Sequence, residues 1–524
     1  MTPSRRAFLG GAGALILPLL APLATRAAGS AATLSVKALG ATGDGRTRDT
    51  QPVQATIDAA ARSGGIVHFP PGEYLCGTLR LRSRVTLQLD ADATIVASGE
   101  DEDFDRPEEL PYDPFADRET ADFRFALLQG RDLDAVAIVG PGRIDANRTR
   151  RGGPKVIALR ECRNVTIRGL TIGNAANYNI SLLGCERVDI VGVTILNGYS
   201  DGIDPDCCRR VRIANCRIES RDDAIAIKTS FSLGYRSATR DVSVTGCHLT
   251  TIHNALKVGT ESTGDFRNIE FRNCTVVGRT HAWAGDLSSG VSLESADGGN
   301  LEDVRVSDIR MVNVRTPIFI RLGERGRAQP RPETGTLRNV SLWSVTASGA
   351  MMASSITGVR GHPVSDVHMK DVRISGRGGG KARIAPQDVP EFERRYPDAY
   401  MFKDLPAWGL YVRHAANLRI ERLDLSLELP DQRAAVMLDD VGGATLRAIQ
   451  AAPSEGDAPM LWLRSVRDGL VQDPRPGAGT RTLVRLSGPD SARIRLAGVD
   501  PRRVETVVVR DADVTATALA TVAP

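Results

Sequence analysis

Two short segments of the sequence are rich in carboxylates. Residues 200–205 read Ser-Asp-Gly-Ile-Asp-Pro, and residues 221–228 read Arg-Asp-Asp-Ala-Ile-Ala-Ile-Lys. Clustered carboxylates raise one another's pKa, so that one can stay protonated while a neighbour stays ionised. Glycoside hydrolysis needs such a pair, because one group protonates the leaving oxygen and another activates water. Asp-Gly and Asp-Asp dipeptides also form ordinary turns and solvated corners. Three clustered carboxylates can instead bind calcium.

Short apolar runs recur along most of the chain. The series begins with NVTIRGLTI from Asn164, RVDIVGVTI from Arg187 and RVRIANCRI from Arg210, and it continues to NLRIERLDL from Asn417. Apolar and polar residues alternate within each run, and β-branched residues are frequent, which is typical of strands. The first runs start 23 residues apart, and later spacings are longer. One such unit cannot bury its apolar face alone, so the repeat indicates a solenoid.

Equivalent apolar positions of the repeats form columns such as Val165, Val188 and Val211. Parallel strands stacked about 4.8 Å apart would turn each column into a ladder inside the coil. Crossovers between parallel strands are nearly always right-handed. We therefore predict an all-β protein, a single-stranded right-handed parallel β-helix. A helical run over residues 51–61 is expected to cap its N-terminal end.

Equal offsets in adjacent coils of a solenoid place residues on one face, one coil apart. Asp201 lies 13 residues after Val188, whereas Asp222 and Asp223 lie 11 and 12 residues after Val211. We therefore expect these three carboxylates to lie within several ångströms of one another.

The eight cysteines fit the ladders better than they fit a disulfide scaffold. Cys216, Cys247 and Cys274 occupy the same apolar column of three successive repeats. Their spacing matches no zinc-binding pattern, and buried free cysteine packs as a small apolar residue. We predict unpaired thiols in the core.

The N-terminal residues have the features of an export signal. Arg5 and Arg6 precede Phe8-Leu9, an apolar run and small residues near Ala28, and the first 28 residues contain no Asp or Glu. This pattern is typical of a twin-arginine signal peptide and predicts a periplasmic or secreted protein. The formal charge of +4 falls to about +1 without the three arginines of this leader, so no electrostatic footprint for nucleic acid remains.

We expect three parts in the chain. Residues 1–28 form the signal peptide, residues 29–445 the β-helix catalytic domain, and residues 446–524 irregular coils of the same solenoid. No later stretch is apolar enough for a bilayer, and we expect neither membrane nor nucleic-acid partners. We also expect a monomer that binds a polysaccharide or oligosaccharide.

The region from Val36 to about Asn417 resembles glycoside hydrolase family 28, the polygalacturonase-like enzymes of pectin degradation. Residues 200–204 are similar to the family's Asn-Thr-Asp-Gly-Ile-Asp motif, and residues 221–228 to its Asp-Asp-Cys-Ile-Ala-Ile-Lys motif, with Ala224 in place of Cys. The first coil also resembles the family's, at residues 40–45 and 65–74.

The resemblance implies an inverting hydrolase of galacturonan or rhamnogalacturonan material that uses no cofactor and no metal. It implies that Asp222 is the general acid, and that Asp201 and Asp223 hold and deprotonate the attacking water.

Two family motifs are altered in this sequence. Asn254 replaces the central His of Gly-His-Gly, and His253 lies one place early. The Arg-Ile-Lys that binds the substrate carboxylate falls on Ser292-Leu293-Glu294, so both cations are lost and an anion is gained. Other residues must then hold the substrate, and Arg325 is one candidate. The predicted substrate-binding residues are His253, Asn254, Lys257, His281, Glu294 and Arg321.

Two long loops are candidates for walls of the binding groove. Residues 101–122 are acidic and proline-rich. Residues 390–408 contain aromatic side chains, among them Tyr396, Tyr400, Phe402 and Trp408, that could stack on sugars or pack beneath the loop. A groove closed at one end would favour exo-action. The alternatives to a hydrolase are a β-helix polysaccharide lyase, which needs calcium and a basic residue, and a non-catalytic carbohydrate-binding solenoid.

Overall fold

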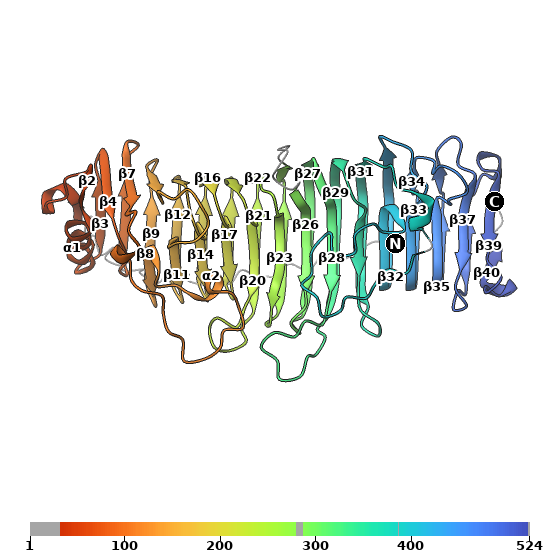
Figure 1. The fold of residues 1–524 in the computed structure, drawn as a ribbon, viewed down its shortest axis with the longest axis horizontal. Helices are drawn as coiled ribbons and strands as arrows, with labels where there is room; N and C mark the ends of the chain where they lie inside the picture. The colour runs from red at the N-terminus through yellow and green to blue at the C-terminus, as the bar shows by residue number, and fades with distance from the viewer. Residues whose placement is uncertain (1–31, 279–286, 386, 522–524) are drawn as a thin grey trace, which may run out of the picture.

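The computed structural model describes residues 32–278, 287–385 and 387–521. These residues form 40 strands in one hydrogen-bonded network, and the named strands pair in parallel throughout. Most strands pair with the third strand before and after them in the sequence, as β12 does with β9 and β15. One turn of the chain therefore contributes one strand to each of three stacks. The predicted parallel β-helix is confirmed, and Figure 1 shows its elongated form.

The first stack contains the repeating apolar runs. Its strands are β1 (Ala32–Ser35), β3 (Gly65–Phe69), β6 (Val85–Leu89), β9 (Asp134–Val139), β12 (Arg163–Arg168), β15 (Glu186–Val191), β18 (Arg209–Ala214), β21 (Thr239–Thr245), β24 (Phe266–Arg272), β27 (Leu301–Val312), β29 (Leu337–Ala350), β31 (Val364–Gly376), β38 (Ile494–Ala497) and β40 (Leu519–Thr521).

The second stack is made of short strands that follow those of the first. They are β2 (Asp44–Arg48), β4 (Gly72–Cys76), β7 (Ala93–Ala97), β10 (Arg143–Asp145), β13 (Thr171–Gly173), β16 (Thr194–Gly198), β19 (Arg217–Ser220), β22 (His248–Thr250), β25 (Thr275–Val277), β34 (Gln450–Ala451) and β36 (Arg475–Pro476).

The third stack carries the carboxylates. Its strands are β5 (Leu79–Arg80), β8 (Ala126–Arg131), β11 (Lys155–Arg160), β14 (Ile180–Leu183), β17 (Ile203–Asp206), β20 (Ile225–Thr229), β23 (Asn254–Ser262), β26 (Leu287–Ser295), β28 (Val314–Leu322), β30 (Ser354–Thr357), β37 (Thr482–Ser487) and β39 (Thr506–Arg510). Long strands β32 (Ala407–Leu427), β33 (Ala434–Arg447) and β35 (Leu461–Gln472) belong to both this stack and the first.

The core is a set of apolar ladders inside the coil. Val165, Val188 and Val211 are direct neighbours in adjacent strands and are at most 2% exposed. Burying one such side chain contributes about 1.5–3 kcal/mol, so the ladders hold the coils in register. The ladder of Cys216, Cys247 and Cys274 lies in the same core, and all eight cysteines are buried and free, which confirms the prediction of unpaired thiols.

Many repeats have Asn or Asp directly before the first apolar position of the strand, and the backbone at this turn explains why. The residue that precedes the first ladder position has a φ of 53–60° in nine repeats, including Asn164, Asp241 and Asn268. Asn and Asp tolerate this left-handed backbone better than most residues. Their side chains also bond between coils, since Asn268 Nδ2 donates to Asp241 Oδ1 at 2.7 Å. The repeat thus encodes both the strand and its turn.

The N-terminal end of the solenoid is covered by α1 (Thr50–Ala61), as predicted, and Figure 1 shows the helix at that end. Val53 and Ile57 of this helix are fully buried. A second helix, α2 (Arg118–Ala121), lies in a long loop. The residues from 446 onward continue the parallel pairing as far as β40. Neither described helix has the length and apolar composition of a membrane span.

Candidate active site

The carboxylates predicted from the sequence lie just before β17 and β20, at the same end of adjacent strands. The Gly202 amide donates to the Asp223 carbonyl at 2.9 Å, so the segments that carry Asp201 and Asp223 are hydrogen-bonded to each other. The structure therefore brings Asp201, Asp222 and Asp223 together. Strand stacking is the reason, since β17 and β20 pair in register through Ile203 and Ile225.

Lys228 holds two of the carboxylates below the surface. Its Nζ lies 2.9 Å from Asp201 Oδ2 and 2.6 Å from Asp204 Oδ1, and it donates to Tyr178 Oη at 3.0 Å. All four side chains are buried. Burial and the neighbouring Asp204 raise the pKa of Asp201 well above its ordinary value, despite Lys228. Burial likewise raises the pKa of Asp204, so this pair retains a proton more readily than exposed aspartates do.

Asp223 has the opposite electrostatic environment. Lys257 Nζ lies 2.8 Å from its Oδ2, and Asn254 donates to its Oδ1 from Nδ2 at 2.8 Å and from the main chain at 3.1 Å. Burial alone would raise the pKa of Asp223, but the Lys257 ammonium holds it below its ordinary value. Asp223 is therefore an ionised carboxylate at neutral pH. Of the predicted binding residues, Lys257 and Asn254 thus contact a carboxylate directly.

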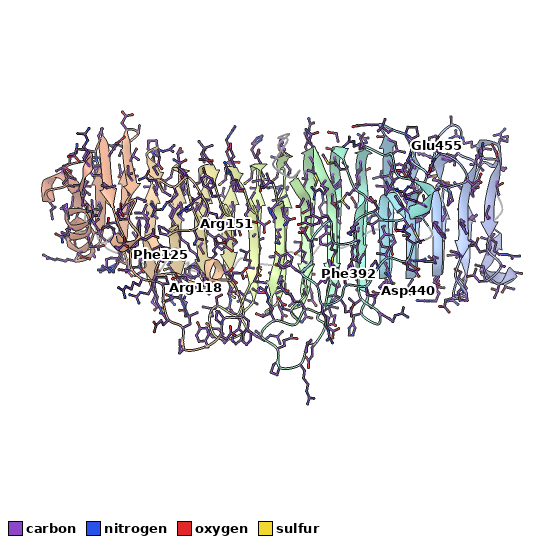
Figure 2. The ribbon with its side chains drawn as sticks, in the orientation of Figure 1. Arg118, Phe125, Arg151, Phe392, Asp440 and Glu455 are labelled. Atoms are coloured by element: carbon purple, nitrogen blue, oxygen red, sulfur yellow. The ribbon has the colours of Figure 1, made fainter. Side chains whose placement is uncertain are left out.

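Asp222 is the most accessible of the three carboxylates, with 18% of its side chain exposed. Arg151 Nη1 donates to its Oδ2 at 2.5 Å, and the same guanidinium donates to Glu119 Oε1 at 3.0 Å. The predicted binding residue His253 lies nearby, with Nδ1 at 3.8 Å from Asp222 Oδ1. Figure 2 places Arg151 over the yellow coils, remote from the blue end that carries Glu455.

Glu294 lies below the site in a buried position. It follows Lys257 by one strand, since Lys257 pairs with Ser292 in the ladder between β23 and β26. Ser292 Oγ donates to Glu294 Oε1, and Oε2 has no hydrogen-bond partner among the described residues. Burial raises the pKa of Glu294 to about 8, although Lys257 acts in the opposite direction. The side chain is therefore a neutral carboxylic acid at neutral pH and places no negative charge in the site.

In the structure the predicted substrate-binding residue Arg321 is engaged by main-chain carbonyls. Arg321 is 2% exposed and donates to the carbonyl oxygens of Gly358 at 2.9 Å and Glu391 at 2.6 Å. Arg321 lies near the end of β28, and its hydrogen bond to Glu391 anchors the loop 387–406. Arg325 is likewise paired, at 2.6 Å from Asp297. His281 lies outside the described residues.

Two long loops cover the third stack on either side of the carboxylates. Phe123, at the end of the loop 98–125, packs in an apolar cluster with residues of β8, β11 and β14. Phe402, in the loop 387–406, packs in another cluster with residues of β28, β32 and β33. Tyr396 of the second loop accepts a hydrogen bond from Lys257 Nζ at 3.3 Å. The carboxylates of β17 and β20 thus lie between two covered regions of one face.

Asp222, Asp223 and His253 could also be considered as metal ligands, because their candidate ligand atoms lie within 4.8 Å of one another. Calcium prefers six to eight oxygen ligands. Here Lys257 and Arg151 already neutralise the two carboxylates, and the third group offers nitrogen. The arrangement is better suited to acid–base chemistry.

The sequence did not single out Arg151, Glu119 or Tyr178, all of which lie close to the carboxylates. Arg151 belongs to a run of three arginines at 148–151, which is indistinguishable from a solvated loop. Only the path of the loops over the third stack reveals these positions.

Comparison with known proteins agrees with this geometry. Residues 126–391 match the family model described as "Glycosyl hydrolases family 28", which spans half of the chain. The chain belongs to glycosyl hydrolase family 28. Residues 33–100 match a second model, "Rhamnogalacturonase A/epimerase, pectate lyase-like".

Relatives of this family 28 hydrolase include a probable polygalacturonase from Vitis vinifera, 24% identical over 365 residues that cover 64% of this chain and 72% of the relative. Among solved structures, the family 28 exopolygalacturonase of Yersinia enterocolitica superposes with a TM-score of 0.59 at 17% identity, over 79% of this chain and 78% of that chain. An exopolygalacturonase of Thermotoga maritima gives a TM-score of 0.56 at 22% identity, over 66% and 87%. These structural likenesses support the β-helix fold.

The raised pKa of Glu294 predicts a pH-dependent cost to stability. The folded state keeps the proton up to about pH 8, whereas the unfolded chain loses it near its ordinary value, so stability falls as pH rises between these limits. Glu294→Gln removes this dependence. Relative to the variant, the parent should lose about 1.4 kcal/mol per pH unit between pH 5 and 8. Denaturant unfolding of both proteins across this range measures it.

Glu302→Gln provides the matched control. Hydrogen bonds from Arg338 and Arg267 lower the pKa of Glu302, so this carboxylate is ionised in both states above pH 5 and its removal should have a constant effect. If the unfolding curves of parent and Glu294→Gln shift in parallel with pH, Glu294 is not a buried neutral acid.

Proposed function

We propose that this hydrolase cleaves pectic polysaccharide or oligosaccharide of the galacturonan or rhamnogalacturonan type, with inversion at the anomeric carbon. The observation that carries the proposal is the contrast between neighbouring carboxylates. Asp223 is held ionised by Lys257 and Asn254, while Asp222 is the accessible carboxylate beside it. An ionised base and an accessible acid are the two groups that acid–base hydrolysis of a glycosidic bond uses, and inversion is proposed from membership of the family. The polygalacturonases among the relatives support pectin as the substrate class.

In the proposed mechanism Asp223 deprotonates the attacking water. Its ion pair with Lys257 keeps it charged and fixes its orientation. Asp201, whose pKa is raised by burial and by Asp204, retains hydrogen-bond donor capacity and holds the water next to Asp223. Lys228 keeps the Asp201–Asp204 pair in place. Asp222 protonates the leaving glycosidic oxygen.

Arg151 supplies a link between substrate recognition and the general acid. The Arg151 guanidinium engages Asp222 in the structure, so this pair must open, and Asp222 must take up a proton from solvent, before it can protonate the leaving oxygen. A uronate carboxylate is a suitable competitor, because guanidinium binds carboxylates through two parallel hydrogen bonds. We propose that the substrate carboxylate draws Arg151 away from Asp222. Arg151 thereby takes over the role of the two cations that Ser292 and Glu294 replace.

The loops on either side of the site favour exo-action. The clusters around Phe123 and Phe402 cover the third stack before and after the carboxylates. An accessible face of limited length suits the end of a polymer better than its middle. We therefore propose that the enzyme acts on chain ends or on oligosaccharides.

We further propose that the protein is exported by the twin-arginine pathway and acts as a monomer outside the cytoplasm. The predicted signal, residues 1–28, lies outside the described residues. The division into a catalytic β-helix over 29–445 and C-terminal coils over 446–524 is part of the same proposal.

Substitution of the acids tests the assigned roles. Asp222→Asn should lower turnover of the natural substrate by about 10²–10⁴-fold, the usual contribution of a general acid. The loss should be much smaller for an aryl glycoside whose leaving group needs no proton. Asp223→Asn should be impaired on both substrates, because water activation is still required. Steady-state kinetics on the two substrates distinguish these outcomes.

Asp189→Asn is the control, since Asp189 lies on β15 outside the site and pairs with Arg168 at 2.6 Å. It should leave both activities unchanged. Near-parent activity of Asp222→Asn on the natural substrate would show that these acids are structural.

Arg151→Gln tests the coupling to a uronate. A charged hydrogen bond contributes about 1.5–3 kcal/mol, so kcat/KM on an oligogalacturonate should fall about 10–100-fold. Activity on a neutral aryl glycoside should not fall, because this substrate has no carboxylate for Arg151 to bind and the variant has no Arg151–Asp222 ion pair to open. Arg168→Gln is the matched control and should affect neither. An equal loss on charged and neutral substrates would contradict the role given to Arg151.

A further inference from the structure

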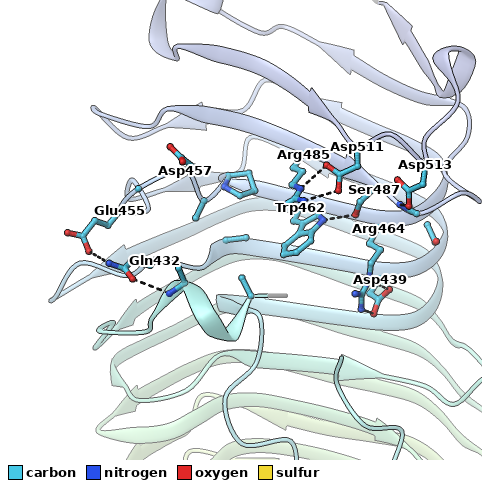
Figure 3. Close-up of a pocket in the computed structure, with 18 of the residues that line it drawn as sticks. Gln432, Asp439, Glu455, Asp457, Trp462, Arg464, Arg485, Ser487, Asp511 and Asp513 are labelled. Carbon is cyan, nitrogen blue, oxygen red and sulfur yellow. Dashed lines mark hydrogen bonds and ion pairs between the residues drawn. The ribbon is translucent and has the colours of Figure 1, made fainter. Parts of the chain in front are cut away.

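A cavity of about 910 Å³ opens on the outer face of the third stack, and most of its lining lies beyond the residues that match family 28. Its walls come from β33, β35 and β37, from the loop 453–459 and from the segment around Ala382. Figure 3 shows Asp439, Trp462 and Arg485 of the three strands. The volume lies in the range of about 300–1,000 Å³ typical of small-molecule sites. The cavity is separate from the carboxylate site, because most of its lining comes from β33, β35, β37 and nearby loops, whereas the carboxylates precede β17 and β20.

The arginines of the cavity are already paired. Arg464 donates to both carboxylate oxygens of Asp439, with Nε at 2.8 Å from Oδ1, and Arg485 donates to those of Asp511 at 3.0 and 2.8 Å. Figure 3 shows both forked pairs facing the cavity. Each arginine–aspartate pair is nearly neutral. The N–H groups and carboxylate oxygens at its edges lie in one plane and can act as oriented donors and acceptors for a ligand.

The remaining ionisable groups of the lining are acidic. Glu455 accepts from Gln432 Nε2 at 2.9 Å, Asp513 accepts from the Gly488 amide at 3.0 Å, and Asp457 is almost fully exposed at the rim. Five carboxylates and two guanidiniums line the cavity, which gives it a formal charge of −3. A uronate or phosphate would be repelled, so the ligand is not anionic.

A fixed aromatic residue forms the floor. Trp462 Nε1 donates to Ser487 Oγ at 2.7 Å, and the Arg485 guanidinium lies 4.7 Å from the centre of its ring. Small apolar side chains that are exposed or partly exposed complete the surface at Ala382, Ala385 and Ala458. A sugar has hydroxyl groups beside C–H surfaces. The arginine–aspartate pairs can hydrogen-bond to the hydroxyl groups, and the small apolar side chains can contact the C–H surfaces.

We propose that this cavity is a second carbohydrate site that binds a neutral oligosaccharide segment and retains the polymer on the enzyme. The site lies seven strand steps from β20 to β35 along the third stack, which at about 4.8 Å per step is about 34 Å. A short oligosaccharide cannot span both sites, whereas a polymer or its neutral side chains can. The proposal goes beyond the hydrolytic activity and does not depend on the assigned catalytic roles.

A divalent cation is a less suitable ligand. Calcium requires six to eight oxygen ligands at 2.3–2.6 Å. Asp439 and Asp511 are engaged by arginines whose charge repels a cation, and Glu455 and Asp513 come from different segments at separate parts of the lining.

Ala458→Trp tests the site by filling it from the rim, where Ala458 is partly exposed and lines the cavity. The ligands are neutral galacto-, arabino- and rhamno-oligosaccharides, oligogalacturonate and calcium, titrated calorimetrically into the full chain carrying Asp222→Asn to prevent turnover. At least one neutral oligosaccharide should bind, and Ala458→Trp should weaken it tenfold or more. Ala516→Trp, an exposed position outside the cavity, should have no effect.

Ala382→Trp, at an exposed position on another segment of the lining, is a second blocking variant should Ala458→Trp not fold. Without the Asp222 substitution, the blocked enzyme should keep its activity on a short substrate and show a raised KM on the polymer. Absence of binding by every neutral oligosaccharide overturns the proposal, as does binding that neither blocking variant weakens. Oligogalacturonate or calcium binding that the blocking variants abolish also overturns it, because the cavity would then serve a charged ligand.

Discussion

Successive coils of the solenoid stack in register, with each strand hydrogen-bonded to its counterpart in the next coil. The apolar ladders through Val188 and Ile190 make this register costly to change, because a shift of one residue would expose every buried side chain of a strand. The same register fixes which side chains of the third stack point out of the coil. Asp204, Ala226, Lys257 and Ser292 therefore occupy one row, and the chemistry of the site is set by which residue each coil contributes to it.

Charges in such a row must be compensated by their neighbours, because water is largely excluded. Lys228 compensates Asp201 and Asp204, and Lys257 compensates Asp223. The two lysines do not give the carboxylates equal properties. One lysine shared by two acids leaves the pKa of Asp201 raised, whereas Lys257 together with Asn254 holds the pKa of Asp223 low. One fold thus places a proton-retaining pair and an ionised base side by side, which is the condition for a water to be held and deprotonated.

The repeat predicted the fold and the proximity of the acids, because ladder positions and offsets are local properties of the sequence. It also placed Lys257 and Asn254 near them, because these residues flank the next strand of the same stack. The loops were less predictable. Arg321 has the sequence context of Lys257, but its donors are taken by the main-chain carbonyls of Gly358 and of Glu391 in the loop 387–406. Arg151 lies in a loop outside the repeating strands. Its contact with Asp222 depends on the conformation of that loop, which the repeat pattern does not predict.

The neutral state of Glu294 likewise could not be inferred from the sequence, where an acidic residue in place of a lysine indicated repulsion of a uronate. Burial removes that charge, so the site remains compatible with an acidic sugar. The central claim, inverting hydrolysis at a chain end by an acid and an ionised base, is tested most directly by proton NMR of the first products from a pectic polymer. The account predicts small saturated sugars whose new reducing end has the anomeric configuration opposite to that of the cleaved bond. Retained configuration, or products with unsaturated ends, would contradict it.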